Sequence, residues 1–135
     1  MRIIVLAVGR LRDPFLDDVA HYEKLLSRYA RLEIVEVGED DKLARRIPDR
    51  SYVVLLDEGG RTYDSVGFSR WLEDRRQAGR DLVLVIGGPF GTKLDAHDAR
   101  LSLGPMTLPF QLARVVLLEQ LYRAHRILAG EPYHH

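Results

Sequence analysis

Two short, uninterrupted apolar runs constrain the fold of this chain more than any other feature of its sequence. Residues 3–8 (Ile-Ile-Val-Leu-Ala-Val) and residues 82–86 (Leu-Val-Leu-Val-Ile) contain no polar side chain. Runs of this length are typical of strands that are buried on both faces. Such strands occur in parallel sheets, because the connections between parallel strands cover the sheet. The chain is therefore expected to form a mostly parallel sheet that contains these two segments.

The segments around these runs carry helical patterns. Apolar residues recur at helical spacing over 14–29, over 64–78 and over about 110–129. Asp13 is expected as the N-cap of the first helix, with Pro14 at its first position. Gly79 is expected to end the second helix.

Three further strands are expected, at 32–37, at 52–57 and within 101–108. Residues 39–50 are charged and predict a short helix or a loop, and a short helix is expected around 93–100. Strands interleaved with helices predict an α/β fold, a mostly parallel sheet of five to six strands with helices on both faces. A chain of 135 residues makes this a single domain, 1–135.

Composition excludes several kinds of chemistry. The chain has no cysteine, which removes disulfides, thiolate nucleophiles and Cys-ligated zinc. His125, His134 and His135 lie close together near a chain end, where ligands converge poorly, so no metal site is expected. The apolar N-terminal run is too short for a signal peptide or a membrane span, which indicates a cytoplasmic protein.

The charges are balanced. Lys and Arg together number 20, as do Asp and Glu, so the net charge is zero. A protein that binds free RNA tightly is usually basic, and the balance therefore argues against free RNA as a high-affinity partner. A structured partner, or a basic patch formed only on assembly, is compatible with it. Nearly all the basic residues are arginine, which suits bidentate contacts to phosphate, although genome composition or thermal adaptation explains the same bias.

Ligands of open α/β sheets bind beyond the carboxyl ends of the strands. Three segments follow strands in this way: Leu56-Asp57, Gly87–Gly91 and 103–108. The sequence Gly-Gly-Pro-Phe-Gly is neither a dinucleotide fingerprint nor a P-loop, so phosphate binding of those two kinds is not expected. It is compatible with a nucleoside held by backbone groups, and also with a plain tight turn. Asp57 could bind a ribose or simply form the turn that follows.

The last helix carries apolar residues over most of its circumference. Such a helix is buried on more than one side, either by the partner in a homodimer or by packing within one chain. Arg114, Arg123 and Arg126 interrupt the apolar surface and need partners there. Glu119, a carboxylate of a second subunit, or RNA phosphate would supply them.

Several segments along the whole chain resemble one family. They are Gly87–Gly91, Ser102-Leu103, residues 106–109 (Met-Thr-Leu-Pro), residues 118–124 (Leu-Glu-Gln-Leu-Tyr-Arg-Ala) and residues 132–134 (Pro-Tyr-His). Each is common alone, but together they are similar to the ribosomal RNA large-subunit methyltransferase H family of the SPOUT superfamily. The resemblance implies a SPOUT-type α/β fold with a deep C-terminal trefoil knot, which general rules of topology would have rejected.

The resemblance also implies an activity. The family is homodimeric and uses S-adenosylmethionine (SAM) to methylate N3 of a pseudouridine in 23S rRNA within the assembled ribosome. A ribosomal partner is compatible with zero net charge. Two alternatives stay open, a ribosome-binding factor without turnover and a SPOUT methyltransferase that acts on tRNA.

By the same resemblance, the SAM contacts fall on the end of one strand, on the glycine turn and on the loop before the last helix. The expected cofactor-binding residues are Leu56, Gly87, Gly88, Leu103, Gly104, Pro105, Met106, Thr107 and Leu108. The chain departs from the family at Gly104, where serine is common, and at Phe110, where histidine is common. Because this chain has phenylalanine at position 110, a catalytic role of the family's histidine cannot be transferred to it.

Methylation at N3 requires that the N3 proton leave, so a group near the acceptor must take it. The candidates are His134, Tyr133 and Arg123. His134 has the ordinary pKa of a base near neutral pH, while Arg123 would stabilise a developing anion or hold phosphate. The alternative for His134 is a surface tail without a catalytic part, because chain ends are often poorly ordered.

Overall fold

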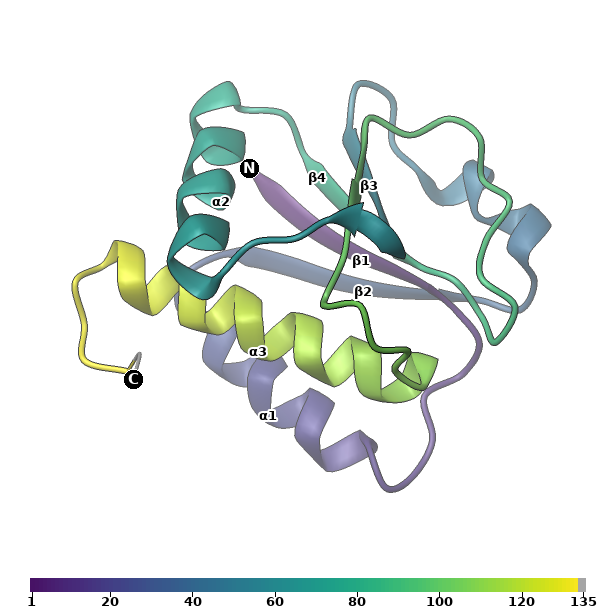
Figure 1. Ribbon diagram of the computed structural model, residues 1–135, viewed down its shortest axis with the longest axis horizontal. Coiled ribbons are helices and arrows are strands. Elements are labelled where there is room, and N and C mark those ends of the chain that lie inside the picture. Colours follow the sequence, from purple (N-terminus) through teal and green to yellow (C-terminus); the bar gives the residue numbers. More distant parts are fainter. Residues whose placement is uncertain (134–135) are drawn as a thin grey trace.

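The two apolar runs lie side by side in the middle of a parallel sheet. The computed structural model describes residues 1–133, and in it β1 (Arg2–Val8) pairs with β4 (Leu82–Ile86). Beyond β1 lies β2 (Arg31–Val37), and beyond β4 lie β3 (Tyr52–Arg61) and the short edge strand β5 (Ala99–Leu101). The order is β2-β1-β4-β3-β5 with every pair parallel, which confirms the predicted α/β sheet (Figure 1).

All three α-helices lie on one face of this sheet. They are α1 (Leu16–Leu26), α2 (Ser65–Ala78) and α3 (Phe110–Leu128), with α3 between the other two (Figure 1). The main core forms where they meet β1 and β4, for example between Leu84 and Leu117.

The other face is covered by shorter elements. Two 3-10 helices, Asp40–Lys42 and Ala44–Arg46, and the loop before β5 bring Leu43, Ile47 and Leu94 against Leu6 and Val85 of the sheet. Both faces are covered as predicted, but the α-helices are confined to one of them. The charged segment 39–50 therefore has a structural part, since Leu43 is fully buried.

Two local predictions were wrong. The first helix begins at Leu16, after Phe15, and Asp13 does not cap it, because its first turn instead carries the carboxylates of Asp17 and Asp18. No helix forms over 93–100. A local side chain takes up a backbone donor there instead: the Leu94 N–H donates to the Thr92 hydroxyl at 3.2 Å, and such bonds compete with a helix.

Strand β3 runs past the point where the sequence predicted its end. Gly59 and Gly60 continue the strand to Arg61, which pairs with Leu101 of β5 after a shift in register. A Cβ on Gly60 would lie 2.7 Å from the Arg100 carbonyl carbon. Gly60 therefore allows the backbones of β3 and β5 to pass close together. In the sequence alone, the same glycine is typical of a turn.

Candidate active site

A cavity of about 520 Å³ opens at the carboxyl end of the sheet. We call it the carboxyl-end cavity. Its walls are the middle of β3, the turn after β4, and the segment from β5 into α3. The lining residues are Leu56, Asp57, Glu58, Ile86, Gly87, Gly88, Pro89, Gly91, Leu101, Leu103, Gly104, Met106, Thr107, Leu108, Pro109, Phe110 and Ala113. This volume is typical of a site for a small molecule.

The structure brings together the three segments that the sequence proposed separately. Every residue expected to bind the cofactor lines the carboxyl-end cavity except Pro105, which is exposed within the same loop. The sequence did not single out Ile86, Pro109 or Ala113, which also line it. Their place in the sequence could have indicated them, because each borders a segment that was already identified at a strand end or at the start of a helix.

The glycine turn is closed by backbone packed against backbone. A Cβ on Gly87 would lie 2.5 Å from the carbonyl carbon of Gly91, and the Gly91 N–H donates to the Gly88 carbonyl at 3.0 Å. The turn is thus tight and it also lines the cavity, while its binding of a nucleoside stays a prediction. Phe90 at its tip is fully exposed.

The opposite wall is also shaped by backbone bonds. The buried Ser102 hydroxyl accepts from the Gly104 N–H at 3.0 Å and donates to the Gly104 carbonyl at 2.9 Å. Gly104 has φ +134°, a conformation that favours glycine. Glycine therefore suits the backbone conformation at position 104, where the family commonly has serine.

Asp57 is the charged group at the mouth of the cavity. It accepts from the Gly59 N–H at 3.2 Å and from Arg100 at 2.6 Å. These two bonds hold the pKa of Asp57 below its ordinary value. The turn-forming contact to Gly59 is therefore present, and Asp57 is an anion beside the cavity.

Phe110 occupies the position where the family commonly has histidine. It lines the carboxyl-end cavity, and its ring lies 3.4 Å from where a Cβ of Gly9 would stand. A phenyl ring carries no proton to exchange. An acid or base for a reaction in this cavity must therefore come from another residue than Phe110.

The C-terminal candidates lie at the other end of α3. Arg123 donates to Glu119 at 2.8 Å, and its guanidinium lies 4.9 Å from the centre of the Tyr133 ring. Tyr133 meets Tyr122 edge to face, with 4.9 Å between ring centres. Burial raises the pKa of Tyr133 above its ordinary value. His134, the third candidate, lies outside the described residues.

Within one chain, Arg123 and Tyr133 do not line the carboxyl-end cavity. Ala113 lines the cavity and Arg123 lies ten residues further along α3, which is about 15 Å at the rise of an α-helix. The structure thus brings Arg123 and Tyr133 together, but not with the predicted cofactor site.

Much of the wide apolar surface of α3 is covered within the chain. The helix lies among α1, α2 and the sheet, and Leu117, Leu118 and Leu121 are fully buried there, whereas Val115, Val116 and Ile127 are half-buried and Leu128 is exposed. The covered part gives no support for a dimer, which stays a prediction.

The arginines of α3 find partners in the chain as well. Arg114 pairs with Glu36 and also donates to the Gly9 carbonyl, and Arg126 pairs with Glu131. Burial alone would raise the pKa of Glu36, but the bonds from Arg114 and from the Leu11 N–H outweigh it and lower that pKa.

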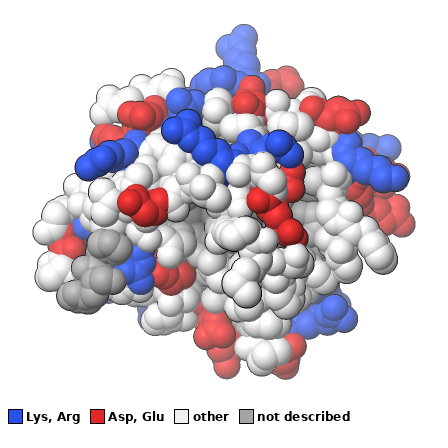
Figure 2. Space-filling model, viewed as in Figure 1, with Lys and Arg blue, Asp and Glu red and all other residues white. Residues whose placement is uncertain are grey.

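The surface shows no single dominant charge on the face in Figure 2. Basic and acidic side chains are interspersed there around a largely uncharged centre, in keeping with a net charge of zero. Within residues 1–133, no three His, Asp or Glu side chains are placed to hold a metal ion. No helix in the same part of the chain is long and apolar enough to cross a membrane.

A parallel sheet with a cavity of small-molecule size at its carboxyl end is typical of α/β proteins that bind a small molecule there. The family described as "Predicted SPOUT methyltransferase" matches residues 1–134. The chain belongs to this family, and the resemblance drawn from the sequence is confirmed.

Curated relatives narrow the assignment. A protein from Gemmatimonas aurantiaca named "Ribosomal RNA large subunit methyltransferase H" is 39% identical, with 99% of each chain covered. Proteins of the same name from Pelobacter propionicus and Ruminiclostridium cellulolyticum are 42% and 38% identical, with 100% and 99% of each chain covered. The chain is thus a SPOUT methyltransferase whose relatives are named for ribosomal RNA.

Proposed function

We propose that this protein uses SAM to methylate N3 of a pseudouridine in 23S rRNA, on the assembled ribosome and in the cytoplasm. The observation that carries the proposal is the carboxyl-end cavity. It gathers the segments that the family resemblance assigns to SAM, although they are separated by up to about 50 residues in the sequence.

The cavity suits SAM in size and in the character of its walls. Gly87, Gly88 and Gly104 present backbone, which can approach an adenosine closely, and Leu56, Met106 and Leu108 offer apolar surface. When bound there, SAM supplies an electrophilic methyl group: its S–C bond breaks with the electron pair left on sulfur, an N3–C bond forms, and the N3 proton passes to a base. The contribution of the protein is mainly to hold the reacting atoms in line.

The base that takes the proton is proposed to come from the C-terminal tail of a second subunit. Arg123 lies about 15 Å along α3 from Ala113 of the carboxyl-end cavity in its own chain, and Tyr133 lies against Arg123. A homodimer of the kind that the resemblance implies brings the tail of each chain to the cavity of the other. His134 would then accept the proton, and Arg123 would stabilise the N3 anion or hold a phosphate.

The trefoil knot belongs to the same proposal. In a knotted chain, the loop 103–108 would be fixed on both sides by threaded backbone. A site made of such loops would be preorganised for its ligand, although it consists of irregular structure.

The balanced charge favours the ribosome over free RNA. A zero net charge and interspersed surface charges provide little attraction to an isolated polyanion. Shape-specific contacts to an assembled particle can replace that attraction.

Transfer of labelled methyl from SAM tests the proposal against its alternatives. Ribosomes that lack the modification, deproteinised rRNA and tRNA are compared as acceptors. We expect label in the 23S rRNA of ribosomes, located at N3 of a pseudouridine by mass spectrometry. Binding to ribosomes without transfer would support the non-enzymatic factor, and label mainly in tRNA would support the tRNA enzyme; either result overturns the proposal.

A further inference from the structure

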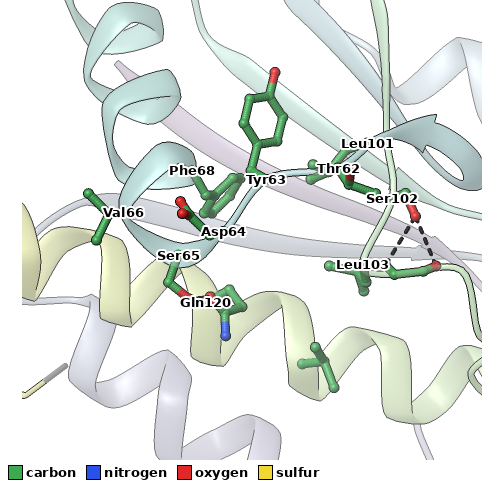
Figure 3. Close-up of a pocket in the computed structure, with 12 residues that line it drawn as sticks. Thr62, Tyr63, Asp64, Ser65, Val66, Phe68, Leu101, Ser102, Leu103 and Gln120 are labelled. Atoms are coloured by element: carbon green, nitrogen blue, oxygen red, sulfur yellow. Dashed lines mark hydrogen bonds between the residues drawn. The ribbon is translucent and has the colours of Figure 1, made fainter. Parts of the chain in front are cut away.

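A second cavity, of about 440 Å³, adjoins the first and is shown in Figure 3. We call it the side cavity. It lies between the start of α2, the segment after β5 and the middle of α3. The lining residues are Thr62, Tyr63, Asp64, Ser65, Val66, Phe68, Leu101, Ser102, Leu103, Gly104, Val116 and Gln120. This cavity was not predicted from the sequence, because its walls come from three separate parts of the chain.

The two cavities meet at one short segment. Leu101, Leu103 and Gly104 line both of them. A Cβ on Gly104 would meet no atom within 4 Å, so the chain leaves open space at this meeting point. A ligand in the side cavity would therefore lie next to a ligand in the carboxyl-end cavity.

The side cavity also lies between the proposed cofactor site and the tail end of α3. Along the helix, Ala113 lines the first cavity, Val116 and Gln120 line the second, and Arg123 follows one turn later.

Gln120 is the polar side chain that α3 contributes to this cavity. Its carboxamide oxygen accepts from the Ser65 hydroxyl at 2.9 Å, and Figure 3 shows the two side chains meeting. Ser65 is itself fixed as the first residue of α2, where Asp64 caps the helix by accepting from the Gly67 N–H at 2.7 Å. The carboxamide is thereby oriented, and it retains two N–H donors and one further lone pair on its oxygen.

The remaining walls suit a flat ring. Tyr63 and Phe68 are aromatic, and Leu101, Leu103 and Val116 are aliphatic. Aromatic and aliphatic walls with one fixed amide are the usual means of holding an unstacked base.

The chemistry of pseudouridine matches this amide. Its base is joined to ribose through carbon, so it keeps an N1–H next to the C2 carbonyl. A carboxamide can accept from N1–H and donate to that carbonyl at once, which leaves N3 free for methylation. Uridine has no N1–H, because its N1 carries the ribose.

We propose that the side cavity holds the base to be methylated, and that Gln120 selects pseudouridine over uridine through the N1–H and C2 carbonyl. The inference rests on the proposed function. Ser65 acts as a positioning residue, since it orients the carboxamide.

The test compares two substrates: ribosomes with pseudouridine at the target, and ribosomes with uridine there. For the wild-type protein we expect kcat/KM to be about ten- to a hundredfold higher on the pseudouridine ribosomes. Gln120→Leu should lower kcat/KM on pseudouridine ribosomes by a similar factor and change it little on uridine ribosomes, so that the ratio approaches one. Ser65→Ala should reduce the ratio less.

Controls separate selection from folding and from cofactor binding. SAM affinity, measured by calorimetry, should be unchanged in Gln120→Leu. Gln77→Leu, on the exposed side of α2, should leave both rates unchanged. If Gln120→Leu and Ser65→Ala both keep the wild-type ratio, the inference fails and the proposed function stands. If the wild-type protein methylates neither kind of ribosome, the proposed function itself fails, and the inference fails with it.

Discussion

The two ends of α3 are built in different ways. At its start, the carboxyl-end cavity is walled largely by backbone from Gly87–Gly91 and 103–108, held in shape by bonds such as that of Ser102 to Gly104. At its end, Arg123, Glu119 and Tyr133 form a cluster of side chains held by an ion pair and a ring contact. The first region lines a cavity in a single chain, whereas the second is a cluster of polar side chains that lines neither of the two cavities described above.

This difference explains which substitutions each end tolerates. A site formed by backbone groups depends on turn geometry, so Gly104 and Phe110 can differ from the family without loss of the cavity. A site formed by side chains depends on their identity and on what they face. The tail therefore needs a partner, and we infer that the partner is the cavity of a second copy.

Removing the tail should have the largest effect. Truncation after Pro132 deletes Tyr133 and the histidines that follow, and should lower the methylation rate at least about a hundredfold, because the proposed proton acceptor is lost. SAM affinity should stay within about twofold of wild type, since the carboxyl-end cavity is built without the tail. Single-turnover methylation and calorimetry measure the two effects. Full activity of the truncated protein would remove the tail from the mechanism.

Filling the carboxyl-end cavity should lower SAM affinity, which the truncation is expected to leave unchanged. Ala113→Phe places a ring in the carboxyl-end cavity, and SAM affinity should fall more than about tenfold, because the ring takes up ligand space. Ala78→Phe, at the exposed end of α2, is the matched control and should bind SAM normally. Normal binding by Ala113→Phe, measured by calorimetry on folded protein, would show that SAM binds elsewhere.

A smaller effect is expected where the start of α3 is anchored. Arg114 is only 1% exposed and pairs with Glu36, whose side chain is 37% exposed. Arg114→Met should lower the free energy of unfolding by about 2 kcal/mol, because the bonds to Glu36 and Gly9 are lost while Glu36 can still be hydrated. Urea unfolding measures this. Arg76→Met removes a surface pair with Glu73, in which the Arg76 side chain is 59% exposed, and should have little effect; an equal loss in both variants would contradict the anchoring role.

The smallest effect concerns pH at the tail end. Burial lowers the pKa of His125 below its ordinary 6.5, although its bond to the Leu121 carbonyl opposes the shift. The unfolded chain therefore binds a proton on His125 at a higher pH than the folded chain does. Stability should fall as the pH drops below about 6.5.

A pair of histidine variants checks this sign. His125→Gln should reduce the loss of Tm between pH 7.5 and pH 5.5, whereas His21→Gln, at an exposed position on α1, should not. An unchanged pH dependence in His125→Gln would show that other groups cause the acid sensitivity.

Much of the first region could be predicted from sequence, because its signals are local. The apolar runs at 3–8 and 82–86 predicted a parallel sheet, and the strand ends expected near Leu56 and Gly87 predicted where a cavity opens. Local signals also misled where a tertiary contact decides the outcome. Gly59 and Gly60 suggested a turn, but the close approach of β5 makes them part of β3.

The second region and the side cavity could not be predicted, because they depend on contacts between distant segments. Gln120 and Ser65 are 55 residues apart, and no pattern in the sequence pairs them. The wide apolar surface of α3 suggested a dimer, but α1 and α2 of the same chain account for its burial. Only the family resemblance indicated that the C-terminal tail takes part in the reaction. It named the residues but did not say where they lie in the structure.

Complementation between two inactive variants tests most directly whether the two regions work together across subunits. Ala113→Phe and the chain truncated after Pro132 are co-expressed with different affinity tags, and the mixed dimer is purified through both. One composite site is then intact, formed by the open cavity of the truncated chain and the tail of the Ala113→Phe chain. The account predicts about half the wild-type rate of methyl transfer to ribosomes. A mixed dimer as inactive as either parent would contradict a site shared between two chains.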